Sequence, residues 1–107
     1  MLIRRDVALA RVHFHDSPES KVRPCIILSD EKYNSSGFVL AASITTASDD
    51  FCMPISAKDV DCALVPGSYA RIDGVIKIRM KNVIRKIGMA TPVFHEHLVN
   101  RMVSMLK

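Results

Sequence analysis

The chain has 107 residues and a formal net charge of +4, and 49% of its residues are hydrophobic. This length suits one domain (residues 1–107), and the apolar content is too high for a disordered chain. The sequence has no apolar run long enough to span a membrane, and its three cysteines lack the paired spacing of a disulfide framework. The N-terminal residues lack a signal peptide's apolar core, so we expect a cytoplasmic protein with no membrane association.

The positive charge is concentrated in the last third of the chain. Residues 71–107 contain 8 basic and 2 acidic residues, whereas residues 1–70 contain 7 basic and 9 acidic residues. A basic segment suits a polyanionic partner such as nucleic acid. A solvated basic surface would explain the same charge equally well.

Apolar periodicity predicts a series of short strands. Residues 6–14 alternate with a period of two, residues 25–29 form a continuous apolar run, and residues 15–22 are polar and predict an exposed loop. Further strands are expected at residues 38–46, 51–55, 68–78 and 82–89, with a break at Asp49-Asp50, a turn at 30–37 and an irregular segment at 56–67.

The period changes near the C-terminus. Thr91 can cap a helix whose first turn contains Pro92, and Phe94, Leu98 and Met102 then recur at helical spacing. The chain is therefore predicted to be mostly β, with five or six strands in a small curled sheet or barrel. One C-terminal amphipathic helix is expected to cover it.

Several motifs occur in the order in which the MazF/PemK toxins have them. Residues 21–30, K-V-R-P-C-I-I-L-S-D, resemble the family's "K-x-R-P" strand. The remaining matches are Arg5-Asp6-Val7-Ala8-Leu9-Ala10, Tyr33-Asn34, the strand ending Ser43-Ile44-Thr45-Thr46, Arg71-Ile72-Asp73 and Arg85-Lys86-Ile87-Gly88. Arg5 replaces the family's usual Gly, Ser43 replaces its usual Pro, and residues 73–77 show no clear match to the basic residue that follows the family's Asp.

This resemblance implies a curled SH3-like β-barrel that forms a homodimer and binds single-stranded RNA in a groove at the dimer interface. It also implies a cognate antitoxin partner and a sequence-selective endoribonuclease activity that needs no metal or other cofactor. In such cleavage the 2′-hydroxyl attacks the phosphate, leaving a 2′,3′-cyclic phosphate. The reaction needs a base, a cation for the charged phosphorane and an acid for the leaving oxygen.

Candidate catalytic residues follow from matching this chemistry to the motifs. By similarity, Arg23 holds the phosphate; an arginine stays protonated in proteins, which argues against a role as the base, and without the resemblance a surface Arg at a strand edge would be the favoured interpretation. Thr45 matches the family's active-site threonine. Arg71 and Asp73 share a strand face and match an Arg-x-Asp pair of the Kid/PemK branch, although an ion pair on a solvated surface is an equal alternative. His15, in the loop before Arg23, is a candidate acid or base.

Other residues are candidates for binding the RNA backbone. They are Lys21, Thr46, Lys77, Arg79 and Lys81, and the last three are predicted to alternate onto one strand face. Sequence selection is expected from the loops at residues 15–22 and 47–50.

Two other functions compete with the nuclease. The departures at Arg5, Ser43 and residues 73–77 suit a degenerate member that binds RNA or antitoxin without cleaving. A CcdB-like gyrase poison is disfavoured because the chain has no Trp. Cys52, Cys62, His95 and His97 fit no zinc spacing, and both histidines are expected to be exposed on the helix.

Overall fold

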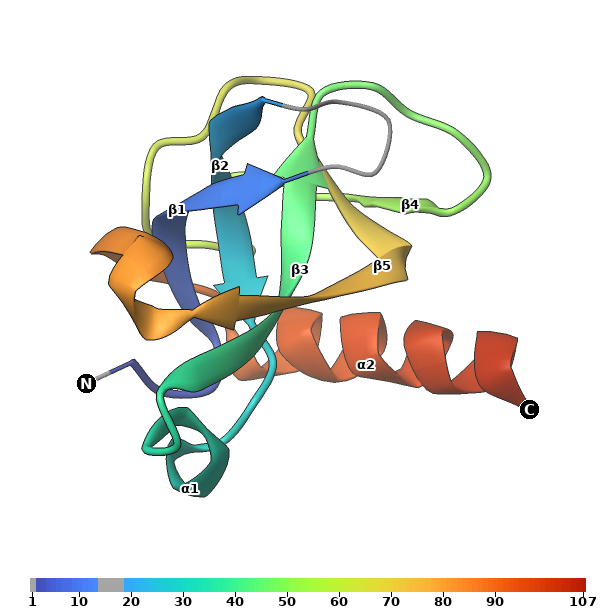
Figure 1. Cartoon of the computed structure of the whole chain (residues 1–107). Coiled ribbons are helices and arrows are strands. Elements are labelled where there is room, and N and C mark those ends of the chain that lie inside the picture. The colour runs from blue at the N-terminus through green and yellow to red at the C-terminus, as the bar shows by residue number, and fades with distance from the viewer. Residues whose placement is uncertain (1, 14–18) are drawn as a thin grey trace.

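The computed structural model describes residues 2–13 and 19–107. Its elements in chain order are β1 (Asp6–His13), β2 (Ser20–Ile27), α1 (Glu31–Asn34), β3 (Phe38–Thr45), β4 (Cys52–Pro54), β5 (Tyr69–Arg79), the 3-10 helix η1 (Met80–Asn82), β6 (Val83–Met89) and α2 (Pro92–Leu106). The strands curl together, and α2 runs along one side of them (Figure 1). Within the described part of the chain, no helix has the length and apolarity needed to cross a membrane.

The six strands form one antiparallel sheet in the order β4-β5-β3-β2-β1-β6. This confirms the predicted fold class, a mostly β protein with one C-terminal helix. One strand boundary was wrong, because residues 20–22 belong to β2 and not to the preceding loop. Lys21 pairs with Val12 and Ser20 pairs with His13. These residues are polar because this end of β2 is open to solvent on both faces. The sequence there therefore shows no alternation of apolar and polar residues.

The sheet curls without closing through strand pairing among the described residues, since β4 and β6 are its two edges. The segment between β4 and β5 bridges these edges instead. Val60 forms an isolated bridge with Ala90, and the Asp61 N–H donates to the Met89 carbonyl over 3.1 Å. The gap in the barrel is therefore filled by irregular chain that pairs with the end of β6.

Glycine is required where this segment crosses β6. A Cβ atom on Gly88 would lie 2.5 Å from the Cβ and 2.8 Å from the Sγ of Cys62. Any side chain at this position would push the bridging segment away from the sheet. The glycine of the Arg85–Gly88 motif is thus explained by packing.

The middle of β5 bends sharply, and this bend positions the candidate site. Ala42 of β3 pairs with Val75 of β5, and Ile44 pairs with Ala70. One residue lies between the two positions in β3, whereas residues 71–74 lie between them in β5. Such a bulge bends its strand and re-aims its side chains. Figure 1 shows the resulting corner in β5 beside β4.

Two apolar cores occupy the two faces of the sheet. One lies between the sheet and α2 and comprises Val7, Ile26, Ala42, Ile44, Val60, Ala70, Ile72, Ala90, Phe94, Leu98 and Met102. The other lies inside the curl and comprises Leu2, Ala8, Ala10, Val12, Cys25, Ile27, Val39, Ala41 and Ile78. Both faces of the central strands are therefore buried, which explains the continuous apolar run at the end of β2.

The C-terminal helix follows its sequence signals. The Thr91 Oγ1 accepts from the Phe94 N–H over 3.2 Å, which confirms the predicted cap. Phe94, Leu98 and Met102 are buried against the sheet, as their spacing predicts. Leu106 is 81% exposed because the last turn of α2 extends beyond the strands (Figure 1).

The backbone at Arg5 has φ +80°, a left-handed conformation that favours glycine. A Gly, the family's usual residue here, would adopt this conformation without strain. The Arg5 side chain partly offsets the strain, because its Nη1 donates to the Ala90 carbonyl over 3.1 Å. Arg5 therefore has a structural role just before β1 and does not lie at the candidate site.

Candidate functional site

Three candidate catalytic residues share one face of the sheet. Cys25 pairs with Ser43, and Arg23 and Thr45 each lie two residues from this pair, towards the same end of the sheet. Residues two apart on a strand share a face, as do directly paired residues. Arg23 and Thr45 therefore face the inside of the curl at its open end.

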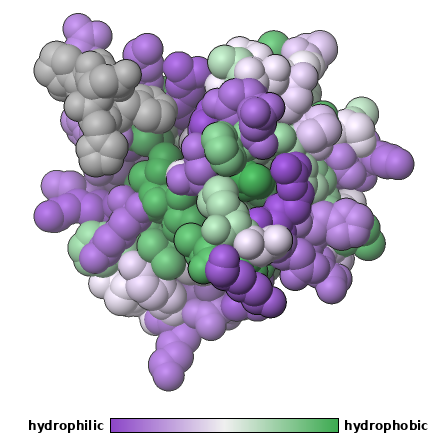
Figure 2. Space-filling view, turned by 90° about the vertical axis from the view of Figure 1, so that its right-hand side faces the viewer, coloured by the Kyte–Doolittle hydropathy of each residue, from purple (hydrophilic) through white to green (hydrophobic). Residues whose placement is uncertain are grey.

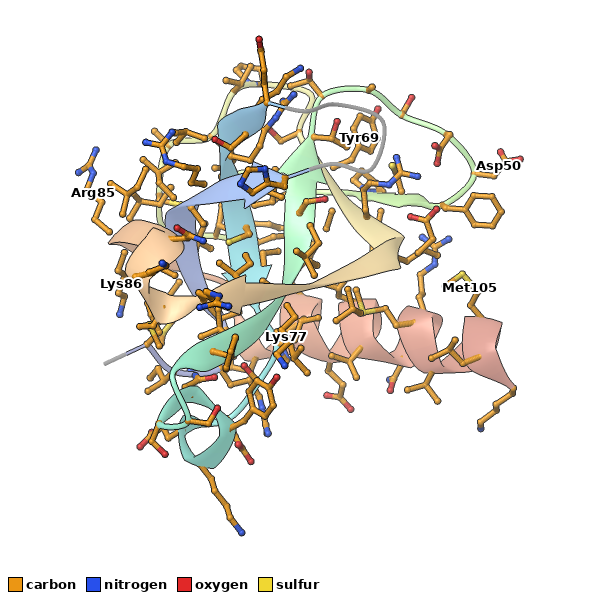
Figure 3. The ribbon with its side chains drawn as sticks, in the orientation of Figure 1. Asp50, Tyr69, Lys77, Arg85, Lys86 and Met105 are labelled. Atoms are coloured by element: carbon orange, nitrogen blue, oxygen red, sulfur yellow. The ribbon has the colours of Figure 1, made fainter. Side chains whose placement is uncertain are left out.

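The third residue, Arg71, reaches the same face from β5. Thr45 pairs with Tyr69, and Arg71 lies two residues beyond Tyr69 and pairs with Cys52. Figure 3 shows Tyr69 beside the end of β3, where this part of the sheet opens. The strand registers thus bring the start of β2, the end of β3 and the first half of β5 to one region.

The Arg71 guanidinium is bound on every nitrogen. Its Nε donates to the Asp73 Oδ1 over 2.9 Å, and its Nη2 donates to the Asp73 Oδ2 over 3.0 Å. The same Nη2 donates to the Asp49 Oδ2 over 3.0 Å, and Nη1 lies 3.6 Å from the Cys52 Sγ. We call Asp49, Arg71 and Asp73 the Arg71 cluster.

Electrostatics in the Arg71 cluster favour the charged forms of Arg71 and Asp49. The hydrogen bonds to Asp73 and then to Asp49 raise the pKa of Arg71 above its ordinary value. The pKa of Asp49 is lowered, first by the backbone N–H of Phe51 and then by Arg71. Two carboxylates around one guanidinium leave the cluster with a net negative charge at neutral pH.

Arg23 and Thr45 are both half-buried, a position from which polar groups can meet a ligand at the surface. Arg23 pairs with Ala10 of β1 and precedes Pro24, which holds it in extended geometry. The Thr45 Oγ1 accepts from the Ala47 N–H over 3.2 Å, so its hydroxyl hydrogen can be donated elsewhere. Lys21 and Thr46 are exposed at the same end of the sheet.

The basic residues of late β5 lie elsewhere. Lys77 and Arg79 come after the bend in β5. Their side chains lie on the face opposite to that of the buried Ile78, so they are exposed on the outside of the curl. They flank the Phe38 ring at 4.2 Å and 5.9 Å from its centroid. Figure 3 shows Lys77 on this second half of β5.

The prediction that Lys81 shares the strand face of Lys77 and Arg79 was wrong. Lys81 lies in η1, where the chain reverses from β5 to β6, so the alternation stops at Arg79. Basic and apolar residues continue to alternate in the sequence through this turn, although the strand has ended. His15 lies outside the described residues, and its predicted role stays a prediction.

Three residues of this region were absent from the sequence-based candidates. Asp49 and Cys52 contact Arg71, and Tyr69 pairs with Thr45. The Asp49-Asp50 pair predicts a break between strands, since such a pair usually marks a loop, and this interpretation gives Asp49 no role in the site. Its proximity to Arg71 depends on tertiary structure.

No group of three or more His, Cys, Asp or Glu side chains suited to a metal ion occurs among residues 2–13 and 19–107. His97 is exposed as predicted, but the same prediction for His95 was wrong, since this side chain is only 7% exposed. His95 flanks the apolar stripe of α2 and is covered by the end of β2, where it hydrogen-bonds to the Ile27 backbone.

Burial of His95 predicts a pH-dependent stability. Desolvation lowers the pKa of His95, and the nearby positive charge of Arg4 adds to this effect. The unfolded chain therefore binds more protons than the folded chain just below the ordinary histidine pKa of about 6.5. We expect the free energy of unfolding to fall as the pH drops from about 7 to about 5, by about 1.4 kcal/mol per unit of pKa difference.

Urea unfolding across this pH range tests the effect. His95→Leu should flatten the pH dependence, whereas His97→Leu, an identical change on the exposed side of α2, should leave it unchanged. An undiminished slope in His95→Leu would show that other groups cause it.

The fold and the polar open end of the sheet define a class of small proteins in which a bent antiparallel sheet packs on a C-terminal helix. The family model described as "PemK-like, MazF-like toxin of type II toxin-antitoxin system" matches residues 3–106, and the chain belongs to this family. No curated protein sequence matches the chain.

Solved structures of the family have the same fold. A MazE–MazF structure from Deinococcus radiodurans superposes with a TM-score of 0.78 at 15% identity, covering 98% of this chain and 95% of that chain. The Mycobacterium tuberculosis toxin MazF-mt6 superposes with a TM-score of 0.73 at 23% identity, covering 94% of each chain. A mycobacterial endoribonuclease in complex with its cognate antitoxin gives a TM-score of 0.72 at 17% identity, covering 97% and 90%.

Proposed function

We propose that this chain is a metal-independent endoribonuclease toxin that cleaves single-stranded RNA through the 2′-hydroxyl. The observation that carries this proposal is the convergence of Arg23, Thr45 and Arg71 on one face at the open end of the sheet. These residues come from three motifs that resemble those of the toxin family, whose model matches residues 3–106. Separate strands supply a cation, a hydroxyl and an Arg–Asp pair, which are the groups that the reaction needs.

Each group has a distinct proposed role. Arg23 binds the scissile phosphate and stabilises the charge of the phosphorane. The Thr45 hydroxyl donates to a phosphate oxygen or orients the 2′-hydroxyl. Asp73 accepts the 2′-hydroxyl proton, and Arg71 holds Asp73 and meets the phosphate. His15 remains a candidate acid for the leaving oxygen.

The RNA backbone is proposed to extend from this site over other basic residues. Lys21 and Thr46 are exposed beside the site and suit the flanking phosphates. Lys77, Arg79 and Lys81 lie farther away and would attract RNA through charge without reading its sequence. Base selection is proposed for residues 15–22 and for the connection at residues 47–50.

The proposed assembly is a homodimer in the cytoplasm that a cognate antitoxin neutralises. Structures of MazE–MazF from Deinococcus radiodurans and of a mycobacterial endoribonuclease with its antitoxin make this partner the natural expectation. Figure 2 shows apolar side chains gathered on the side of the molecule where β4 and the bend of β5 lie. Phe51, in the turn just before β4, and Val75 of β5 are about half exposed and are proposed to contribute to such contacts.

Cleavage of a long single-stranded RNA in EDTA tests the proposal. We expect discrete cuts, mapped by primer extension, with a 2′,3′-cyclic phosphate on the upstream fragment and a 5′-hydroxyl on the downstream one. Absence of cutting by folded protein at any ratio to RNA, or cuts that EDTA abolishes, would contradict it.

A second candidate is a family member that binds RNA or antitoxin without cleaving. Acceptors on Arg71 take four of its five N–H groups, which favours this function because little of the guanidinium is left for a phosphate. RNA binding without any cleavage product would support this candidate over the nuclease.

A further inference from the structure

The orientation of the Arg71 guanidinium does not depend on Asp49. The two parallel hydrogen bonds from Arg71 to Asp73, at 2.9 Å and 3.0 Å, already fix the plane of the guanidinium. Asp49 comes from a different segment, the connection between β3 and β4, and adds a second carboxylate bond to Nη2. Its main effect is therefore a second negative charge beside Arg71.

The Asp49 carboxylate is held in place independently of Arg71. Its Oδ1 accepts from the Phe51 N–H over 2.8 Å, while its Oδ2 contacts Arg71. The Asp49 carbonyl also accepts from the Cys52 N–H over 3.3 Å at the start of β4. A carboxylate fixed in this way occupies the position where a phosphate oxygen would meet Nη2, since both anions bind a guanidinium with similar geometry.

We propose that Asp49 is an intramolecular competitor of the RNA phosphate for Arg71. In the free protein its carboxylate occupies Nη2, and a bound phosphodiester of single-stranded RNA takes its place. Asp49 then sets a threshold: a phosphate that is well positioned by Arg23 and the neighbouring groups displaces it, and a poorly positioned one does not. This inference rests on the proposed function, because it assumes that RNA binds at the Arg71 face.

The test compares Asp49→Asn with Asp50→Asn. Both variants remove one negative charge from the same connection, and Asp50 lies exposed next to Asp49 (Figure 3). An Asn at position 49 keeps an oxygen for the Phe51 N–H, so the turn should persist. Fluorescence anisotropy would measure Kd for a fully 2′-O-methylated oligonucleotide, which binds but cannot be cleaved through a 2′-hydroxyl.

We expect Asp49→Asn to bind this oligonucleotide about two- to fivefold more tightly than Asp50→Asn, the range expected for releasing one exposed ion pair. In an Arg71→Gln background the advantage of Asp49→Asn should disappear, because the competitor acts through Arg71. Equal affinities for the two single variants, weaker binding by Asp49→Asn, or an advantage that persists without Arg71 would each overturn the proposal.

Cleavage assays on the same proteins separate this inference from the proposed function. Tighter binding by Asp49→Asn with no cleavage by any protein would support the competitor and contradict the nuclease. Cleavage by the natural chain with no difference between the two variants would support the nuclease and overturn the competitor. Failure of all the proteins to bind or cleave RNA would overturn both.

Discussion

Arg23→Ala should lower kcat/KM for RNA cleavage by at least about 100-fold, the usual cost of removing one donor that stabilises transition-state charge. Arg23 is half-buried at the open end of the sheet, on the face that also carries Thr45 and Arg71. A guanidinium can bind two phosphate oxygens at once, and its loss would leave the proposed site without one of its two arginines. Arg23→Lys should recover only part of the activity, because an ammonium is a point charge.

Lys21→Ala is the matched control for Arg23→Ala. Lys21 lies two residues earlier on β2 and is exposed. Its loss should weaken RNA binding modestly and reduce the salt dependence by about one unit of slope, with the cleavage step unaffected. Single-turnover rates with saturating protein separate these effects. Equal losses in the two variants would remove Arg23 from the chemistry and make it one phosphate contact among several.

Leu98→Ala should lower the free energy of unfolding by about 2–5 kcal/mol. Leu98 is fully buried where α2 meets the sheet, in the core that includes Ile72 and Phe94. Its truncation removes apolar contacts and leaves a cavity that a close-packed interior fills only in part. For a domain of this size the melting temperature should drop by roughly 10 °C or more.

The same substitution at the end of the helix supplies the control for Leu98→Ala. Leu106 is 81% exposed, so Leu106→Ala should change the free energy of unfolding by less than about 0.5 kcal/mol. Urea denaturation of both variants beside the natural chain measures the difference. Similar losses at the two positions would mean that the helix is not packed on the sheet as described.

The sequence predicted the strands and the helix because their signals are local. Alternation in β1, the apolar run in β2 and the helical spacing of Phe94, Leu98 and Met102 each follow from one buried face. The strand at residues 20–22 was missed because Lys21 and Val22 are exposed and Ser20 is polar, so no buried face marks it. The exposure of His95 was predicted wrongly because helical spacing shows which residues lie at the centre of the buried face. It does not show which residues beside that centre are also buried.

The candidate site was only partly predictable. Arg23, Thr45 and Arg71 were nominated through family motifs, and the strand registers then place them on one face. Asp49 was missed because its partner lies 22 positions away, in a bulge that no local pattern announces. A single row was predicted for Lys77, Arg79 and Lys81, but the bend of β5 separates the row from the site, and Lys81 lies apart from the other two in η1.

The most direct test of the account uses a short RNA that contains one mapped cut site, with and without a single 2′-deoxy substitution at the nucleotide before the cut. In EDTA, we expect the all-ribose RNA to be cut to a 2′,3′-cyclic phosphate and the substituted RNA to remain intact at that position. Cleavage of the substituted RNA at the same bond would contradict attack by the 2′-hydroxyl, and with it the roles proposed for Arg23, Thr45 and Asp73.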